Sequence, residues 1–377
     1  MALGPEDGSR LVPVAPFLKT ALAAAELCGV TRLADITRLD RLGLPVWQAV
    51  RPAGRALSVH QGKGASPLAA RIGALCEAIE CHCAENAPAD GPLCSFADLP
   101  PDARAPDVAD YAESRDAPPS AYQPIQWCLA KDIPTGRDHF LPHPLVSLDW
   151  TWGHDSLFDR ESSGLGAGSD EGAALRVSLL EIIERDALGE WRRGDFESQM
   201  ATSLALATIP FDWLRSWKAR FDEFRIELQL FRLSSIVSIP AFMCVIGGAE
   251  EFGPAYRRFY GSAAHGDPEL ALFKAFAEAL QSRLTVIAGV RDDILPSYYT
   301  SRPAAATEVN EPAPTGTVAW EEAAPLAYGW ETIVEGLARR GYSQVVAKRL
   351  DGGLGVVVTR AFVPGLGSSR RTRRIVP

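Results

Sequence analysis

Apolar residues recur at helical spacing over several long stretches of the chain. Such spacing places them on one face of an α-helix. We expect helices beginning near residue 15, at 67–85, from about 172 to 193, at 268–288 and at 331–341. The second of these has the clearest start signal, because Ser66 suits the N-cap and Pro67 suits the first helical position.

Other stretches alternate between apolar and polar residues, or are apolar over a few residues, which predicts β-strands. We expect strands at 46–50, 55–59, 125–133, 139–148, 226–233, 239–248, 342–350 and 355–363. The turn sequence PTGRD at 134–138 joins two of them into a hairpin. Strands and helices mixed in this order indicate an α+β or mixed α/β fold rather than a barrel of alternating units.

Two stretches rich in proline and alanine interrupt these patterns. Residues 86–122 include APADGPL and LPPDARAPD, and we interpret them as a covering loop or insertion. Residues 301–325 are interpreted as a linker or mobile loop. A third stretch, SSGLGAGSDEG at 162–172, is expected to be a glycine-rich loop that leads into the long helix ending near Arg193.

Composition and charge narrow the class of protein. The chain has 377 residues, of which 47% are hydrophobic and 23% charged, and its net charge is −9. These values are ordinary for a soluble globular protein, and the acidic balance gives no bulk attraction for nucleic acid or an anionic membrane. The sequence shows neither a signal peptide nor an apolar run of the roughly 20 residues that a membrane span needs. We therefore expect a cytoplasmic protein without a nucleic-acid or membrane partner.

One side-chain pattern appears in three of the expected helices. Each carries two acidic or amide residues three positions apart, which places both on one helix face. The pairs are Glu77 and Glu80, Glu181 and Glu184, and Glu278 and Gln281. The residues one and two turns earlier are small, namely Ala70, Gly73 and Ala74, then Ala174 and Ser178, then Ala271 and Ala275. We interpret them as leaving room for a ligand; the alternative is that the acidic pairs lie on solvated helix faces.

Carboxylates brought together need a counter-charge. Left alone they would repel one another, and several would stay protonated. A hard divalent cation resolves this, and Mg²⁺ usually binds a few carboxylates together with substrate phosphates. A nucleoside triphosphate therefore fits, with Gly62-Lys63-Gly64, the glycines of 164–168, Arg185 and Arg283 as donors. The GKG sequence lacks the spacing of a Walker A loop, so an exposed loop position is the alternative for Lys63.

Three segments, in this order, resemble the three ATP-binding blocks of the YcaO family. They are QGKGASPLAARIGALCEAIE, GLGAGSDEGAALRVSLLEIIERDAL and GSAAHGDPELALFKAFAEALQSRLTVIAGVRDD. The preceding segment TRLADITRLDRLGLPVWQAVRP looks like the opening of stand-alone members. The resemblance extends from about Gly29 to Val363. It divides the chain into an N-terminal extension, 1–28, and a single YcaO-type catalytic domain, 29–377.

The resemblance implies a fold and a set of site residues. The fold would be the YcaO-type ATP-binding fold, α+β (mixed α/β), with helices packed on mixed, largely antiparallel sheets. The residues matching the family's magnesium ligands are Glu77, Glu80, Glu181 and Glu184, with Glu171 and Glu278 as further candidates. The positions implied for ATP binding are Ser58, Lys63, Gly73, Ser169, Arg185, Gln281 and Arg283. ATP and Mg²⁺ are the implied cofactors.

The resemblance also implies an activity. Members of the family phosphorylate a backbone amide oxygen after a nucleophile has added to the carbonyl, which turns a poor leaving group into a good one. The product is a thioamide or an azoline in a ribosomally made peptide or protein. We therefore expect a peptide or protein substrate and a partner protein, TfuA-like or substrate-docking. A homodimer is left open.

The sequence departs from the family pattern in four places. Gly168-Ser169-Asp170 stands where the family usually has Gly-Asn-Thr, and Ala173-Ala174 stands where it has a Glu-Ala pair. The polar residue expected at Val177 is missing, and the C-terminal RRTRRIVP lacks the proline-alternating tail of azoline-forming relatives. Asp170 or Glu171 is a possible substitute for the missing glutamate.

These departures keep a second hypothesis open, in which the chain is a nucleotide-binding scaffold or accessory protein without turnover. A third hypothesis, a carboxylate-bridged di-metal oxidase, needs Glu-x-x-His pairs. We discount it because no histidine follows Glu80, Glu184 or Glu278 at that spacing.

Overall fold

The computed structural model describes residues 4, 14–111, 120–151, 158, 160–248, 258–300, 316–321, 326 and 329–366. Most of the loop expected at 301–325 and the C-terminal residues 370–377 lie outside this part of the chain. Residues 112–119 of the expected insertion lie outside it as well. The expectations for these segments stay predictions, as does the division into an extension and one domain.

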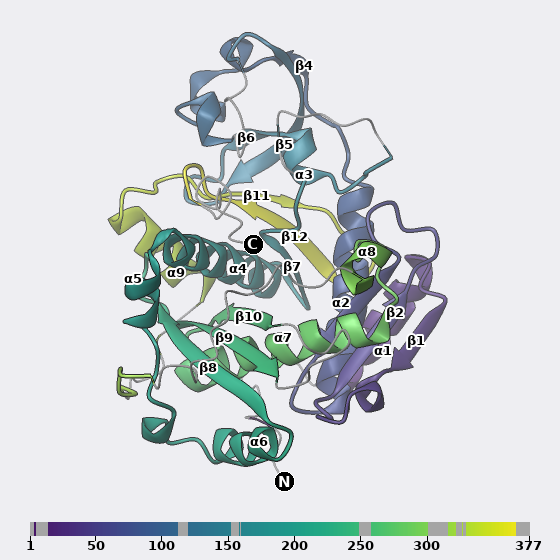
Figure 1. The fold of residues 1–377 in the computed structure, drawn as a ribbon. Helices are drawn as coiled ribbons and strands as arrows, with labels where there is room; N and C mark the ends of the chain where they lie inside the picture. The colour runs from purple at the N-terminus through teal and green to yellow at the C-terminus, as the bar shows by residue number, and fades with distance from the viewer. Residues whose placement is uncertain are drawn as a thin grey trace.

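Within the described ranges the strands form three antiparallel sheets (Figure 1). The first joins β1 (Arg32–Asp35), β2 (Val46–Val50) and β3 (Val59–Lys63) in that order. The second has the order β10-β9-β8, with bounds Phe259–Ala264, Ala241–Gly248 and Ile226–Leu233. The third has the order β4-β5-β11-β12-β7, with bounds Leu93–Ser95, Pro124–Asp132, Val346–Arg349, Val357–Phe362 and Leu165–Gly168, and β6 (Asp138–Pro142) pairs with β5. This arrangement confirms the expected α+β class with largely antiparallel sheets.

All five helices expected from the apolar spacing are present. They are α1 (Val14–Leu27), α2 (Pro67–Glu85), α4 (Glu171–Arg193), α7 (Pro268–Ala288) and α9 (Trp330–Arg339). Shorter helices are α3 (His143–Val146), α5 (Phe196–Met200), α6 (Asp212–Glu223) and α8 (Pro296–Thr300), and 3₁₀ turns lie at 37–39, 96–98, 101–103, 108–110 and 206–208. None of the helices in the described ranges is long and apolar enough to cross a membrane.

Three similar strand–helix units organise the centre of the molecule: β3 with α2, β7 with α4, and β10 with α7. In each unit the N-cap side chain (Ser66, Asp170 or Asp267) accepts a hydrogen bond from a backbone N–H in the first helical turn. Each helix packs on its own strand and also on the strand of the next unit, since α2 contacts β7, α4 contacts β10 and α7 contacts β3. The units therefore close into a ring, and Figure 1 shows the three helices grouped between the sheets.

A glycine in each of the three strands lies against the backbone of the unit's helix. Each glycine and the two small helix residues that it faces are Gly62 with Ala70 and Ala74, Gly166 with Ala174 and Ser178, and Gly261 with Ala275 and Ala279. A Cβ on Gly62, for example, would lie 2.1 Å from the helix backbone. The small helix residues therefore allow a strand to pack closely against the helix. Our interpretation that they leave room for a ligand is wrong at these positions.

Replacing Gly261 by alanine is expected to destabilise the fold by at least about 1–3 kcal/mol, the usual cost of overpacking a core. The added Cβ would lie 2.3 Å from the oxygen of Ala275 and 2.3 Å from the nitrogen of Ala279, and neither backbone atom can move freely. Denaturant unfolding measures the loss. Gly329→Ala is the matched control, because the nearest atom to its Cβ belongs to the flexible side chain of Glu331. Equal stability of the two variants would contradict the close packing.

The second sheet lies between two of the three long helices. One face of β8–β10 packs on α7 and α6 through side chains such as Leu230 and Phe276. The other face packs on α4 and α9 through side chains such as Met243 and Ile183. The edge strand β10 therefore has α7 on one side and α4 on the other.

Several elements differ from the sequence prediction. The strand expected at 55–59 is β3, Val59–Lys63, so Gly62 and Lys63 lie in a strand rather than in a glycine-rich loop. Residues 165–168 of the second glycine-rich stretch form β7. Glycine suits both strands because a side chain would collide with the helix, and a strand glycine often marks such a close approach.

The expected hairpin and insertion also differ in detail. The second hairpin strand ends at Pro142, and His143–Val146 form a short helix, since proline cannot continue a hydrogen-bonded ladder. The expected insertion is more than a cover. It contributes β4 and buried side chains such as Phe96 and Tyr111, which pack with Trp127 of β5.

Candidate functional site

Five carboxylates from the three long helices lie close to one another. They are Glu77 and Glu80 of α2, Glu181 and Glu184 of α4, and Glu278 of α7. Burial is the main cause that raises the pKa values of three of them, and repulsion adds to it: from Glu278 on Glu77, from Glu181 on Glu80, and from Glu278 on Glu184. Each of these pairs joins two different helices. The ring of units therefore brings together the acidic residues that the sequence singled out.

Residues in or directly before the edge strands donate hydrogen bonds to all five carboxylates. The first glutamate of each helix is bound by a backbone N–H from its own unit, and the second glutamate of α2 and of α4 is bound by the strand of the next unit. The own-unit bonds run from Gln61 to Glu77 (2.8 Å), from Gly164 to Glu181 (3.2 Å) and from Ser262 to Glu278. The bonds between units run from the N–H of Ala167 to Glu80 and from the hydroxyl of Ser262 to Glu184 (2.6 Å).

Cations partly neutralise the carboxylates. The Nζ atom of Lys63 lies 2.9 Å from Oε2 of Glu278, and a guanidinium nitrogen of Arg185 lies 3.5 Å from Oε1 of Glu181. Arg185 is held more firmly protonated by Glu184 first and by Glu181, so its pKa is raised. Lys63 thus joins the first unit to the third, although the two residues of this ion pair are far apart in the sequence.

The pKa values divide the carboxylates into two groups. Burial, followed by repulsion from Glu181 and Glu77, raises the pKa of Glu80 to about 8. Burial also raises the pKa of Glu184 to about 8, against the opposing charge of Arg185. For Glu278, burial is outweighed by Lys63, by Arg185 and by the N–H of Ser262, and its pKa is lowered. Glu80 and Glu184 therefore hold protons near neutral pH that a cation would displace.

The donor set fits a magnesium ion that is held jointly with phosphate. Among the residues that the structure describes, no three Asp, Glu, His or Cys side chains are arranged to hold a metal ion by themselves. Mg²⁺ usually takes one or two carboxylates and completes its coordination with phosphate oxygens and water. The carboxylates also remain reachable, since the side chains of Glu181 and Glu278 are 22% and 30% exposed. The glutamate oxygens are hard donors whose protons a cation can displace, so they are suitable ligands for Mg²⁺.

Other residues predicted to bind ATP lie at the edge of this cluster or outside it. The hydroxyl of Ser58 donates to Asp292 at 2.8 Å, in the loop after α7. The hydroxyl of Ser169 donates to Asp170 at 3.0 Å, beside the start of α4. Gly73 faces β3, where a Cβ would lie 3.2 Å from the Cα of Gly62. Their contacts with ATP stay predictions.

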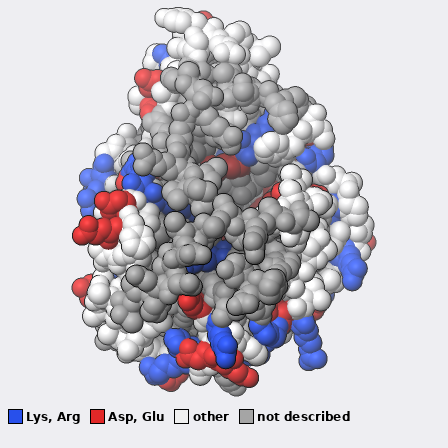
Figure 2. Space-filling model, viewed as in Figure 1, with Lys and Arg blue, Asp and Glu red and all other residues white. Residues whose placement is uncertain are grey.

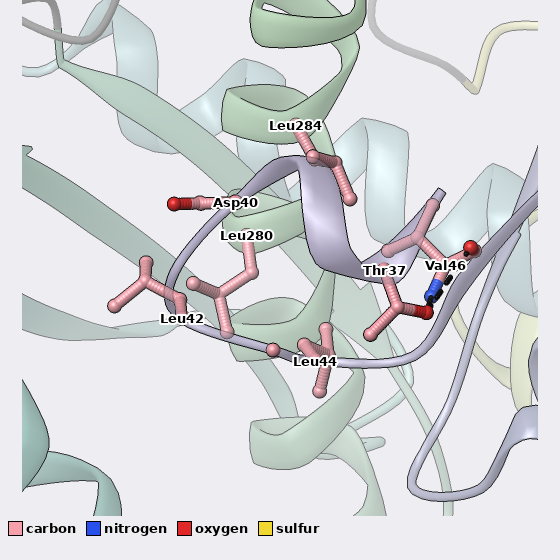
Figure 3. Close-up of a pocket in the computed structure, with 8 residues that line it drawn as sticks. Thr37, Asp40, Leu42, Leu44, Val46, Leu280 and Leu284 are labelled. Carbon is pink, nitrogen blue, oxygen red and sulfur yellow. Dashed lines mark hydrogen bonds between the residues drawn. The ribbon is translucent and has the colours of Figure 1, made fainter. Parts of the chain in front are cut away.

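The structure does not bring Arg283 into the cluster. Its guanidinium pairs with Asp40 at 2.9 Å, and both side chains are only 5% exposed. Asp40 also lines a small, mainly aliphatic recess with Leu280 and Leu284 of α7 (Figure 3). This recess contains none of the five carboxylates.

Two further candidates have different settings. Gln281 of α7 is half-buried, and its backbone oxygen accepts a hydrogen bond from Thr285. Glu171 is exposed at the first position of α4, and its charge lies close enough to Arg349 to contribute to the raised pKa of that guanidinium. The roles predicted for both residues are not tested by their positions.

Sequence reasoning missed three residues of the site. Burial raises the pKa values of Glu77 and Glu181, and the charges of Arg291 and Arg360, respectively, lie close enough to oppose that rise. Ser262 binds two of the carboxylates. Arg291 comes three positions after the end of the third helix, in the RDD sequence, which is a signal that could have found it. The contacts of Arg360 and Ser262 depend on strand positions that the sequence pattern does not reveal.

Comparison with known proteins gives the same fold and family. A family model described as YcaO cyclodehydratase, ATP- and Mg²⁺-binding, matches residues 61–367. A protein from Methanothermobacter thermautotrophicus is 30% identical over 360 residues, covering 90% of each chain. A protein described as lying in the tfuA 3′ region of Rhizobium leguminosarum bv. trifolii is 34% identical over 276 residues, or 72% of this chain and 66% of the relative.

Two solved structures share the fold. One is a heterocyclase in complex with substrate and cofactor (TM-score 0.74, 19% identity), which aligns with 96% of this chain and 53% of its own. The other is YcaO from Methanopyrus kandleri bound with AMPPCP and Mg²⁺ (TM-score 0.70, 21% identity), aligned over 95% of this chain and 92% of its own. This chain thus spans about half of the heterocyclase. The family description confirms ATP and Mg²⁺ as the expected cofactors, and the chain belongs to the YcaO cyclodehydratase family.

Proposed function

We propose that this chain uses ATP and Mg²⁺ to activate a peptide-backbone amide by O-phosphorylation. The observation that carries the proposal is the convergence of five carboxylates from α2, α4 and α7 with Lys63 and Arg185. Membership of an ATP- and Mg²⁺-binding family supports the use of nucleotide. The heterocyclase of the same fold, solved with substrate and cofactor, supports a cofactor-dependent reaction on a bound substrate.

Each set of residues has a distinct task in this proposal. Bound Mg-ATP supplies the phosphoryl group and the positive charge that stabilises its transfer. Glu77, Glu80, Glu181 and Glu184 are the proposed magnesium ligands, and Arg185 is placed to hold phosphate oxygens. Lys63 has to exchange its ion pair with Glu278 for a phosphate. Such a site acts chiefly by positioning the reactants and neutralising charge.

The atoms of the proposed reaction balance simply. A nucleophile adds to the amide carbonyl, the amide oxygen takes the γ-phosphoryl group, and this oxygen then leaves as inorganic phosphate while ATP becomes ADP. A sulfide nucleophile gives a thioamide, and a side-chain nucleophile gives an azoline. The relative from the tfuA region supports a TfuA-like partner and hence the thioamide. A homodimer stays open, and we propose the cytoplasm as the compartment because ATP is plentiful there.

Phosphate release tests the activity, and mass spectrometry tests the product. The chain is co-expressed with candidate peptides and with proteins encoded beside it, and the masses of the peptides are then measured. Exchange of oxygen for sulfur identifies a thioamide, whereas loss of water identifies an azoline. Phosphate release that rises with peptide and partner supports the proposal. Mg-ATP binding with no peptide-stimulated release under these conditions favours the scaffold hypothesis instead.

The scaffold hypothesis rests on Ser169 and Ala173, where family residues are missing. Asp170 is the N-cap of α4, and its carboxylate accepts hydrogen bonds from the N–H of Ala173 at 2.9 Å and from Ser169. Glu171 is exposed, and its carboxylate interacts electrostatically with Arg349. Asp170 or Glu171 stays the proposed substitute for the missing glutamate.

Restoring the missing glutamate tests this point. We expect Ala173→Glu to leave ATP binding unchanged or to strengthen it, because this position in the first turn of α4 should face the phosphate–magnesium site. The helix dipole also favours a carboxylate there, by about 0.3–1 kcal/mol. Calorimetry measures ATP binding, and phosphate release measures turnover. If the chain is an enzyme in which Asp170 or Glu171 already replaces the missing glutamate, turnover changes little. If the chain is an inert scaffold, the restored glutamate produces some turnover. Strong loss of ATP binding would show that position 173 does not face the phosphates.

A further inference from the structure

Ser262 contacts carboxylates from two different helices. Its hydroxyl donates a hydrogen bond to Oε1 of Glu184 at 2.6 Å, and its backbone N–H bonds to the carboxylate of Glu278. The residue is only 3% exposed. A buried hydroxyl costs free energy unless it has a hydrogen-bond partner. The short bond to Glu184 therefore holds both groups in place.

The position of β10 explains how one residue reaches two helices. β10 is an edge strand with α7 on one face and α4 on the other. Gly261 faces α7, where its Cβ would lie 2.3 Å from the oxygen of Ala275. Because side chains alternate along a strand, Ser262 points to the opposite face, toward α4. Its N–H lies at the strand edge and remains available to Glu278.

The two carboxylates that Ser262 holds repel each other. The charge of Glu278 contributes to the raised pKa of Glu184. The charge of Arg185 attracts both carboxylates and so offsets part of this repulsion. A guanidinium on a long side chain does not by itself set the distance between them. Ser262 does so, because its hydroxyl and its N–H belong to one residue of a paired strand.

Glu184 also differs from its neighbours in the kind of donor it receives. The donors to Glu77, Glu80 and Glu181 from the strand units are backbone N–H groups of Gln61, Ala167 and Gly164. Glu184 receives a side-chain hydroxyl. This bond can therefore be removed by a substitution that leaves the backbone unchanged.

We propose that Ser262 is a positioning residue of the magnesium-nucleotide site, which fixes the carboxylates of Glu184 and Glu278 relative to each other. The inference rests on the proposed function. Ser262 need not touch the metal or the nucleotide. It acts through the carboxylates, as residues that orient metal ligands generally do.

Mn²⁺ binding in the presence of a non-hydrolysable ATP analogue tests the inference, with free Mn²⁺ followed by electron paramagnetic resonance. Ser262→Ala is expected to weaken Mn²⁺ binding by about 10–100-fold, the usual effect of losing a residue that orients a ligand. The control is Ser178→Ala. Ser178 is a fully buried serine of α4 whose hydroxyl pairs with Thr359 at 2.8 Å and not with a carboxylate. This variant should lose stability in thermal unfolding but keep its Mn²⁺ affinity.

A second pair of variants separates positioning from packing. Ser262→Thr keeps the hydroxyl, whereas Ser262→Cys keeps the approximate size and donates only weakly. The inference requires weaker Mn²⁺ binding by the cysteine variant than by the threonine variant. If the alanine variant fails to fold, this comparison alone tests the positioning role.

The inference can fail in two distinguishable ways. If Ser262→Ala binds Mn²⁺ like wild type while Glu184→Gln does not, the positioning role is wrong and the proposed function stands. Equal affinity of the threonine and cysteine variants has the same meaning. If the wild-type protein binds no Mn²⁺ with the nucleotide analogue, the proposed function itself fails and the inference fails with it.

Discussion

Replacing Glu184 by glutamine should weaken Mg-ATP binding by at least about a hundredfold while the protein stays folded. Removing a residue that only orients a metal ligand typically costs 10–100-fold in metal affinity, and removing the ligand itself should cost at least as much. Glutamine keeps the size of the side chain and can still accept the hydrogen bond from Ser262. The substitution therefore removes the negative charge and little else. Isothermal titration with Mg-ATP measures the change, and Glu181→Gln is expected to behave in the same way.

Glu190→Gln is the matched control for this experiment. Glu190 lies on the same helix as Glu184, but it is exposed and paired with Arg193 on the surface. Figure 2 shows such charges of both signs interspersed over one face of the molecule. An exposed ion pair of this kind contributes little to stability. The control should bind Mg-ATP like wild type, and wild-type affinity in Glu184→Gln and Glu181→Gln as well would mean that the carboxylates lie on a solvated face.

The acidic pairs could be predicted from the sequence because helix periodicity is local. The first glutamate of each helix lies eleven positions after the N-cap, at Glu77, Glu181 and Glu278. Since a helix fixes the direction of every side chain relative to its first turn, equal offsets place these glutamates alike in the three units. The repeat along the chain therefore indicated their convergence before the sheets were known.

The partners of these glutamates could not be predicted in the same way. Lys63 pairs with Glu278, which is 215 positions away, and Ser262 binds Glu184, which is 78 positions away. Both contacts depend on the order in which the strand–helix units close into a ring. The glycines were misinterpreted for a related reason. Gly62 looks like part of a phosphate-binding loop in the sequence, whereas in the fold its missing side chain admits a strand against α2.

The two protonated carboxylates make Mg-ATP binding depend on pH. The pKa values of Glu80 and Glu184 are each raised to about 8, chiefly by burial. Metal ligands must be deprotonated, so binding displaces these protons. We expect the affinity for Mg-ATP to rise from pH 6.5 to about pH 8 and then to level off. Each required deprotonation contributes about tenfold per pH unit below the pKa.

The same shifts set the sign of the stability change in the ligand-free protein. The folded-state pKa of each group lies above its ordinary value of 4.5. Their contribution to stability is therefore fully present below pH 4.5 and is lost as the pH rises through about 8. Mg-ATP should restore stability most strongly at the upper end of this range, because it then binds carboxylates that are already ionised.

Calorimetry in two buffers of different ionisation enthalpy can count the displaced protons directly. The titration is carried out at pH 7.5, where the γ-phosphate of ATP contributes little, and a Mg-ATP blank without protein corrects for the rest. We expect net proton release on binding by the wild-type protein. Glu80→Gln removes one of the two titrating carboxylates and should release fewer protons. An affinity that does not change between pH 6.5 and 8, with no release of protons, would mean that Glu80 and Glu184 are already ionised in the free protein.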